Sequence, residues 1–333
     1  MIELWRDMRR RGRALLALVL AMLIVAPMVA DRYVLSVLTL ILYLAYVGQA
    51  WNLMTGYAGQ LSLGHALYVG IGAYISALMW LHFGIGPWAS VFVAVAVAAA
   101  FGAFIGWLGF RFGIEGVYFA LLTIAFAEFT RIAFDNMDIT GGAGGLFMPY
   151  EEKRIGEWWN LRGTQVMFYY VALILASAAV LITARLARSR LGYQWLAVRE
   201  DEAAARALGI DSFRAKMTAV VISAGMTAVG GVFYAFYYLT LFPSQVLDMS
   251  RSIEMILGPI VGGLGTIFGP VVGAFILTPV GEALIAMTER LGFNAPGTKA
   301  VFYGVILMAI ITLRPSGVWP WLVRKLGLAR RKK

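Results

Sequence analysis

The chain has 333 residues, of which 61% are hydrophobic and 14% charged, and its formal net charge is +10. This composition excludes a soluble domain. Several apolar runs approach or exceed the roughly 20 residues that a helix needs to cross a bilayer, so the sequence predicts an all-α polytopic membrane protein in contact with lipid. The apolar runs are continuous rather than alternating, which excludes a β-barrel. With no cysteine, the chain has neither disulfides nor a cysteine-ligated metal.

The basic residues lie at the two ends and in loops, which argues against a nucleic-acid partner despite the positive charge. Their distribution follows the positive-inside rule and predicts that both termini are cytoplasmic. The first apolar run, Ala14–Ala30, has a charged flank but no convincing cleavage site, so we expect a retained first span rather than a signal peptide. The terminal basic residues are Arg6, Arg9, Arg10, Arg11, Arg13, Arg324, Lys325, Arg330, Arg331, Lys332 and Lys333.

A second span is expected at Val34–Met54, and the stretch that follows, Thr55–His65, is too polar and glycine-rich to face lipid. It predicts a bend or a broken helix, whose backbone must be buried in protein or line a watery cavity. One interpretation is that the stretch lines the translocation pathway. The other is that its glycines and His65 serve helix packing. The candidate pathway residues are Gly56, Gln60, Ser62 and His65.

Three further spans are expected at Ala66–Leu81, Trp88–Phe110 and Val117–Phe134. The last of these contains Glu128 and Arg131, which lie three residues apart and therefore on one helix face. Charges inside a span are costly and normally face protein or a cavity. The spacing predicts an intramembrane ion pair, either structural or part of the pathway.

The longest external segment, Asp135–Gly163, is predicted to be a periplasmic loop. Its glycine-rich start predicts a flexible backbone turn, which we expect to close the periplasmic mouth of the cavity. The candidate residues there are Thr140, Gly141 and Gly142.

After a sixth span, Gln165–Ala184, residues 185–216 form a charged segment that span parity and charge both place in the cytoplasm. Within it, Asp201–Leu208 predicts one short helix, with acidic residues first and Gly209 just past its end. Asp211 or Ser212 is expected to cap the next helix. A short polar helix between two spans predicts a docking element, and its candidate residues are Glu202, Ala203, Ala204, Ala205, Leu208 and Gly209.

The seventh span is expected at Met217–Leu239, two short crossings within Ile253–Thr288 and a final span at Lys299–Leu313. Because the basic tail must end inside, the sequence predicts about ten spans in a single transmembrane domain covering 1–333, with eight as the alternative.

Four segments resemble the permease subunits of ABC importers, specifically the branched-chain amino acid permease family: TGYAGQLSLGHALYVGIGAY, TGGAGGL, REDEAAARALGI and GGLGTIFGP. The resemblance extends over about residues 34–315 and implies the ABC importer permease fold in a bacterial inner membrane. It also implies that REDEAAARALGI is the coupling segment that sits in a cleft of the ATP-hydrolysing subunit. The implied partners are a homologous second permease, two cytoplasmic ATPases that bind ATP, and a periplasmic solute-binding protein.

One departure from the family pattern bears on the solute. In TGGAGGL, Ala143 and Gly144 stand where many members have polar residues. The solute therefore stays open between a branched-chain amino acid, urea, a short amide and an aromatic acid.

The sequence has no Walker-type loop, nucleophile elbow or paired carboxylates, so no catalytic residue is predicted. His65 and His82 are not at ligand spacing, so no metal site is predicted either. Transport energy must then come from a partner, entering near Glu202. The alternative function is an ion- or proton-coupled secondary transporter, which would use Glu128 and Glu282. A structural scaffold would not need a polar glycine-rich bend inside the membrane.

Overall fold

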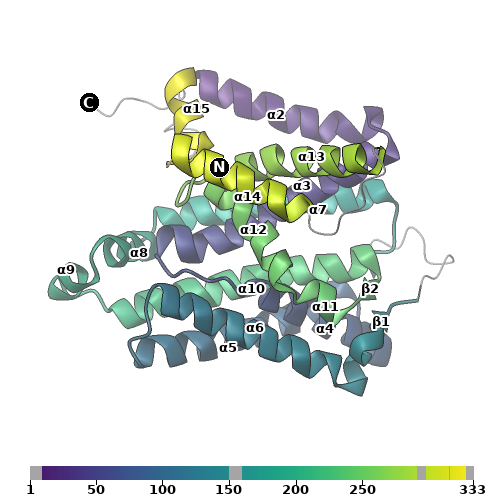
Figure 1. The fold of residues 1–333 in the computed structure, drawn as a ribbon, viewed down its shortest axis with the longest axis horizontal. Coiled ribbons are helices and arrows are strands. Elements are labelled where there is room, and N and C mark those ends of the chain that lie inside the picture. Colours follow the sequence, from purple (N-terminus) through teal and green to yellow (C-terminus); the bar gives the residue numbers. More distant parts are fainter. Residues whose placement is uncertain (1–9, 150–159, 291–297, 315, 328–333) are drawn as a thin grey trace. The chain divides into compact units, whose positions relative to one another are not determined.

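The computed structural model describes residues 10–149, 160–290, 298–314 and 316–327 (Figure 1). The chain divides into two compact units. Unit 1 comprises Met1–Gln49, Gln165–Ala184 and Leu257–Lys333, and unit 2 comprises Ala50–Thr164 and Arg185–Ile256.

The described part of the chain is almost entirely helical, as predicted. Seven of its helices are long and apolar enough to cross a membrane, and a shorter apolar helix covers Ala14–Val29. The first helices are α2 (Arg10–Val29), α3 (Arg32–Asn52), α4 (Ala66–Phe83), α5 (Pro87–Arg111), α6 (Val117–Asp135) and α7 (Gln165–Ala187). The remaining helices are α8 (Arg190–Glu200), α9 (Glu202–Ala207), α10 (Ser212–Tyr238), α11 (Pro243–Val246), α12 (Met249–Gly262), α13 (Gly269–Arg290), α14 (Thr298–Leu313) and α15 (Val318–Leu326).

Helix α10 is the core of unit 2, and its small residues allow neighbouring backbones to approach it closely. A Cβ atom on Gly231 would overlap the carbonyl of Val69 in α4, and one on Gly72 would overlap the carbonyl of Ala228 in α10. On α5, a Cβ atom on Gly102 would lie 2.8 Å from the Ala224 side chain. Such small-residue contacts are the usual way for apolar helices to associate in a membrane.

The second predicted span ends later than expected. Helix α3 continues into one π-helical turn, η1 (Leu53–Tyr57), and an irregular stretch follows up to His65. We call residues 53–65 the break segment. The predicted broken helix is therefore present, and its first turn is wider than an α-helical one.

The glycine-rich start of the loop after α6 is more ordered than the predicted flexible turn. Two 3-10 turns, η2 (Asp138–Thr140) and η3 (Gly142–Gly144), lead into strand β1 (Leu146–Phe147). This strand pairs antiparallel with β2 (Thr240–Leu241), a contact between distant parts of the sequence. The middle of the predicted periplasmic loop, residues 150–159, lies outside the described residues, as do the outermost basic residues of both termini.

The two crossings predicted within Ile253–Thr288 are unequal. Helix α12 has only 14 residues, whereas α13 has 22. A 14-residue helix spans about 21 Å, less than the hydrocarbon core of a bilayer. Glycines let the backbones of the two helices pack in direct contact. A Cβ atom on Gly273 would overlap the carbonyl of Gly258, and a Cβ atom on Gly262 would overlap the carbonyl of Gly269. Gly265 lies in the turn between these two helices, at φ +67°.

Candidate functional site

Helix α9 forms where the sequence predicted a docking helix, and local capping defines both of its ends. The Asp201 side chain accepts a hydrogen bond from the Ala204 N–H at 3.0 Å. At the other end, Gly209 has φ +83°, and its N–H donates to the Arg206 carbonyl at 2.9 Å. The Ile210 N–H donates to the Ala205 carbonyl at 3.0 Å, which completes a Schellman motif. Asp211 then caps α10 by accepting from the Arg214 N–H at 3.0 Å.

The predicted docking residues divide into an inner and an outer group. Ala205 is buried at 2% exposure, and Glu202 pairs with Arg206 at 2.9 Å and with Lys216 on α10. Ala203, Ala204 and Gly209 are exposed, and Leu208 is 82% exposed. The inner group therefore holds α9 in place, and the outer group, with one large apolar side chain, is what a partner can reach.

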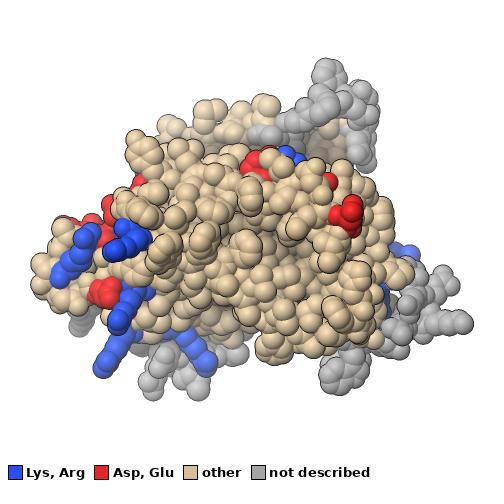
Figure 2. Space-filling view, turned by 90° about the horizontal axis from the view of Figure 1, so that it is seen from below, with Lys and Arg blue, Asp and Glu red and all other residues tan. Residues whose placement is uncertain are grey.

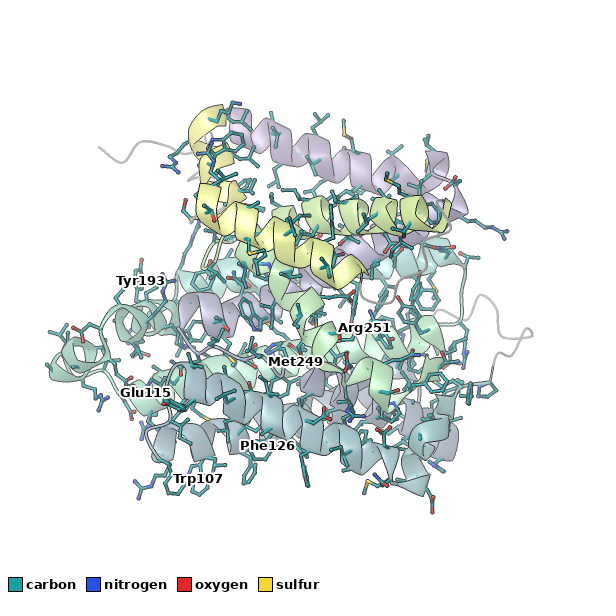
Figure 3. All side chains as sticks on the ribbon, in the orientation of Figure 1. Trp107, Glu115, Phe126, Tyr193, Met249 and Arg251 are labelled. Carbon is teal, nitrogen blue, oxygen red and sulfur yellow. The ribbon has the colours of Figure 1, made fainter. Side chains whose placement is uncertain are left out.

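The carboxyl of Glu202 is held in its charged form. Burial by itself raises the pKa of Glu202, but hydrogen bonds from Lys216 and Ser212 and the charges of Lys216 and Arg206 outweigh that effect and lower it. Lys216 also lies 3.1 Å from Glu115, in the turn between α5 and α6. Figure 3 labels Glu115 at the same end of unit 2 as α8 and α9.

Helix α8, which the sequence analysis did not predict, precedes α9 and is anchored by a tryptophan. Trp195 is fully buried, and its Nε1 donates to the Ala215 carbonyl of α10 at 2.9 Å. Ser189 caps the helix by accepting from the Gly192 N–H at 3.4 Å. The serine cap and the buried Trp195 and Val198, three residues apart, are the sequence signals that could have revealed α8.

Charged side chains gather around this end of unit 2. In Figure 2, Lys and Arg side chains cluster where Figure 1 places α8 and α9, with acidic side chains between them. The exposed charged residues of this segment include Arg190, Arg199, Glu200, Asp201, Arg206, Asp211 and Arg214.

The break segment is buried and hydrogen-bonded to protein. Ser62 is fully buried and Gln60 is 8% exposed. The Ser62 carbonyl accepts from Trp51 Nε1 at 2.7 Å, and the Gln60 carbonyl accepts from Thr55 Oγ1 at 2.9 Å. The N–H groups of Leu63 and Gly64 donate to Thr123 Oγ1 on α6, at 3.1 and 3.3 Å. Protein groups thus provide these hydrogen-bonding partners in this conformation, and the pathway role of the segment stays a prediction.

His65 connects the break segment to α10. Ser223 Oγ donates to the Ala50 carbonyl at 2.7 Å, and Thr227 Oγ1 donates to the Ser223 carbonyl at 2.8 Å. Because each hydroxyl has only one hydrogen, the Nε2–H of His65 donates to both hydroxyl oxygens, at 3.2 and 3.0 Å. Nδ1 then faces Ser62 Oγ at 3.5 Å. This arrangement is that of a packed, hydrogen-bonded histidine.

The Thr140 turn lies at the end of α6. Thr140 is 2% exposed, and its Oγ1 lies 2.6 Å from the Phe134 carbonyl and 2.8 Å from that of Met137. Gly141 and Gly142 have φ +77° and +54°, which only glycine adopts readily. The 3-10 turn η3 contacts α6 and α11, and the π-turn η1 of the break segment contacts α8 and α10, while Leu63 and Gly64 of the break segment also reach α6 at Thr123. Whether the two stretches share one pathway stays a prediction.

Glu128 and Arg131 lie in contact, and a third charge joins them. Arg131 Nη2 is 2.5 Å from Glu128 Oε1, and Arg131 Nη1 is 2.8 Å from Asp135 Oδ2. The side chains of Glu128, Arg131 and Asp135 are 48%, 24% and 21% exposed. The sequence predicts that the loop begins at Asp135, but α6 extends through this residue. The arginine is therefore the shared centre of a three-residue cluster.

Because Arg131 bridges two carboxylates, we expect Arg131→Gln to destabilise the protein more than Glu128→Gln. Losing Glu128 leaves the pair between Arg131 and Asp135, at a cost of about 0.5 kcal/mol or less, whereas losing Arg131 removes both pairs and leaves two carboxylates without their cation, at a cost of about 1 kcal/mol. The double variant should be no worse than Arg131→Gln alone. Thermal unfolding of the purified protein measures all three. Equal losses in the two single variants would contradict the shared-centre arrangement.

The buried break between apolar helices and the capped helix α9 are the features of a polytopic membrane transport protein. Residues 33–311 match the family described as branched-chain amino acid transport system / permease component. The chain therefore belongs to this family and is a multi-pass inner-membrane protein. Among the described residues, no group of His, Cys, Asp and Glu side chains could hold a metal ion.

The individual relatives are also permease proteins of transport systems. The high-affinity branched-chain amino acid transport system permease protein LivM of Escherichia coli K12 is 28% identical over 331 residues, covering 93% of this chain and 75% of the relative. LivH of the same strain is 24% identical over 287 residues, covering 82% and 90%. The autoinducer 2 import system permease protein LsrC of an Enterobacter species is 28% identical over 224 residues, covering 66% and 62%. No solved structure matches the chain significantly.

Proposed function

We propose that this chain is the permease subunit of an ATP-driven importer for branched-chain amino acids or a related small polar solute. The observation that carries the proposal is α9, a capped helix between two long apolar helices that is fixed from within by Glu202 and Lys216 and presents Leu208 outward. Family membership and the printed names of LivM, LivH and LsrC support the transport role. The proposed partners are a second homologous permease, two ATPases and a solute-binding protein.

In this mechanism the chain binds no ATP itself. Closure of the ATPases around ATP moves α9, and the movement changes which side of the membrane the central cavity faces. The break segment and the Thr140 turn border the route, with both termini and residues 185–216 in the cytoplasm. The cation cluster around α8 and α9 supports this orientation, because basic loops remain on the cytoplasmic side.

The solute class is left open by the Thr140 turn. Ala143 and Gly144 are both exposed and bring no polar side chain to it. In the proposed importer the binding protein would carry most of the selection. The solute can be identified by competition of labelled leucine uptake with isoleucine, valine, urea, a short amide and an aromatic acid.

The full complex in proteoliposomes tests this function. We expect solute uptake to require ATP and the binding protein and to persist when a protonophore removes the proton gradient. Uptake that is driven by a proton or ion gradient without ATP would instead establish the secondary transporter. Of the two carboxylates that this alternative would use, Glu128 is paired with Arg131.

A further inference from the structure

One side chain connects the cytoplasmic segment to the break segment. Arg199, on α8, donates from Nη1 to the carbonyl oxygen of Gly56 in η1. Its Nη2 lies 3.4 Å from Glu200. Arg199 is outside the docking residues of α9, and none of the roles proposed above uses it. Both ends of the contact belong to unit 2, so it is part of one compact body.

The carbonyl that Arg199 reaches is one that the end of a helix leaves without a helical partner. The carbonyls before it are satisfied locally, since Met54 accepts from the Gln60 N–H and Thr55 from the Gly59 N–H, both at 3.1 Å. Gly56 receives a guanidinium instead. A cation at the C-terminus of a helix is favoured by the helix dipole. Arg199 therefore caps η1 from another part of the chain.

The backbone at Gly59 leaves room for the Arg199 side chain because glycine has no Cβ atom. Gly59 has φ +72°, and a Cβ atom there would lie 3.0 Å from Arg199 Cγ. Any side chain at position 59 would thus be strained in its backbone and would press on the arginine. The glycine and the arginine form one contact, and a change on either side should loosen it.

Both ends of this contact are tied to α10 by separate bonds. On the cytoplasmic side, Trp195 holds α8 to Ala215. On the other side, His65 holds the break segment to Ser223 and Thr227. A movement of α8 and α9 can therefore reach the membrane helices along α10, or through Arg199 into the break at the end of α3. The first path reaches the break segment at its last residue, His65, whereas the second reaches it near its start, at the Gly56 carbonyl in η1.

We propose that Arg199 is a positioning residue that transmits displacement of the α8–α9 segment to the break segment. The inference rests on the proposed function for its use in transport, because it assumes that the ATPases move α9. The contact between Arg199 and Gly56 is independent of the proposed function. Arg199 holds the break closed at rest and pulls on the Gly56 carbonyl when α8 moves.

The first arm of the test needs only the purified permease. Since the chain has no native cysteine, a single cysteine introduced by Ser62→Cys reports opening of the break by its rate of reaction with a maleimide. Adding Arg199→Met, or Gly59→Ala from the opposite side, should raise that rate about tenfold, the effect expected from losing one charge-assisted hydrogen bond. Arg199→Lys should recover part of the protection. Arg214→Met, at an exposed arginine paired with Asp211, is the matched control and should change nothing.

The second arm uses the complete transporter. Arg199→Met should co-purify with the ATPases and keep their ATP hydrolysis, while solute taken up per ATP falls about tenfold, again the scale of one charged hydrogen bond. An unchanged labelling rate, or an unchanged uptake per ATP, overturns the proposal. If the native complex takes up no solute with ATP, the proposed function fails, and the labelling arm still decides whether Arg199 holds the break closed.

Discussion

Gly231→Ala should lower the stability of the protein sharply, although it adds only one methyl group. Gly231 lies in the C-terminal third of α10, where a Cβ atom would overlap the Val69 carbonyl and lie 2.8 Å from the Ala73 nitrogen. Both atoms belong to the backbone of α4, so no side chain can turn away, and the two helices must separate. Overpacking of this kind costs about 1–3 kcal/mol or more. We expect a lower melting temperature and a smaller folded yield in detergent.

The matched control is Gly304→Ala, the same substitution inside another apolar helix. A Cβ atom at Gly304 would meet no heavy atom within 4 Å. Alanine should therefore be tolerated there, or stabilising by up to about 1 kcal/mol, because glycine is the poorer helix former. If both variants melt at the native temperature, the backbone contact between α4 and α10 does not hold unit 2 together.

The sequence was most informative where structure is decided locally. The Asp201 cap, the alanine run and Gly209 lie within one short stretch and specify α9 without help from the rest of the chain. Long apolar runs likewise predicted the membrane helices to within a few residues at most ends. The break after α3 followed from a local conflict, since its glycines and polar residues cannot face lipid.

Features that depend on distant residues were not predictable. The packing of α8 against α10 depends on the bond from Trp195 to the Ala215 carbonyl, and the π-turn at Leu53–Tyr57 is capped by Arg199, a residue far along the chain. Strand β1 exists only because β2 lies beside it. Which residues of α9 face inward and which face outward was also not predictable from the sequence. Ala204 and Ala205 are neighbours in the chain, but only Ala205 is buried.

The outer face of α9 leads to the second large expected effect, which concerns binding of the ATPases. Leu208→Ala should weaken co-purification of the ATPase subunits about tenfold or more, because a leucine that becomes fully buried contributes about 1.5–3 kcal/mol. Ala204→Arg should abolish it, since a long charged side chain would stand where a small one meets the partner. Both positions are exposed in the free subunit, so neither change should disturb its folding.

Ala143→Arg provides the control for Ala204→Arg, because it adds the same side chain at an exposed alanine in the turn after α6. It should leave co-purification of the ATPases unchanged. The inner residues should behave differently: Glu202→Gln removes the acceptor that pairs with Arg206 and Lys216 and should lower the melting temperature of the free subunit as well. Normal ATPase binding by both Ala204→Arg and Leu208→Ala would show that α9 is not the docking helix. The docking surface would then be expected on the exposed face of α8, where Tyr193 is 67% exposed.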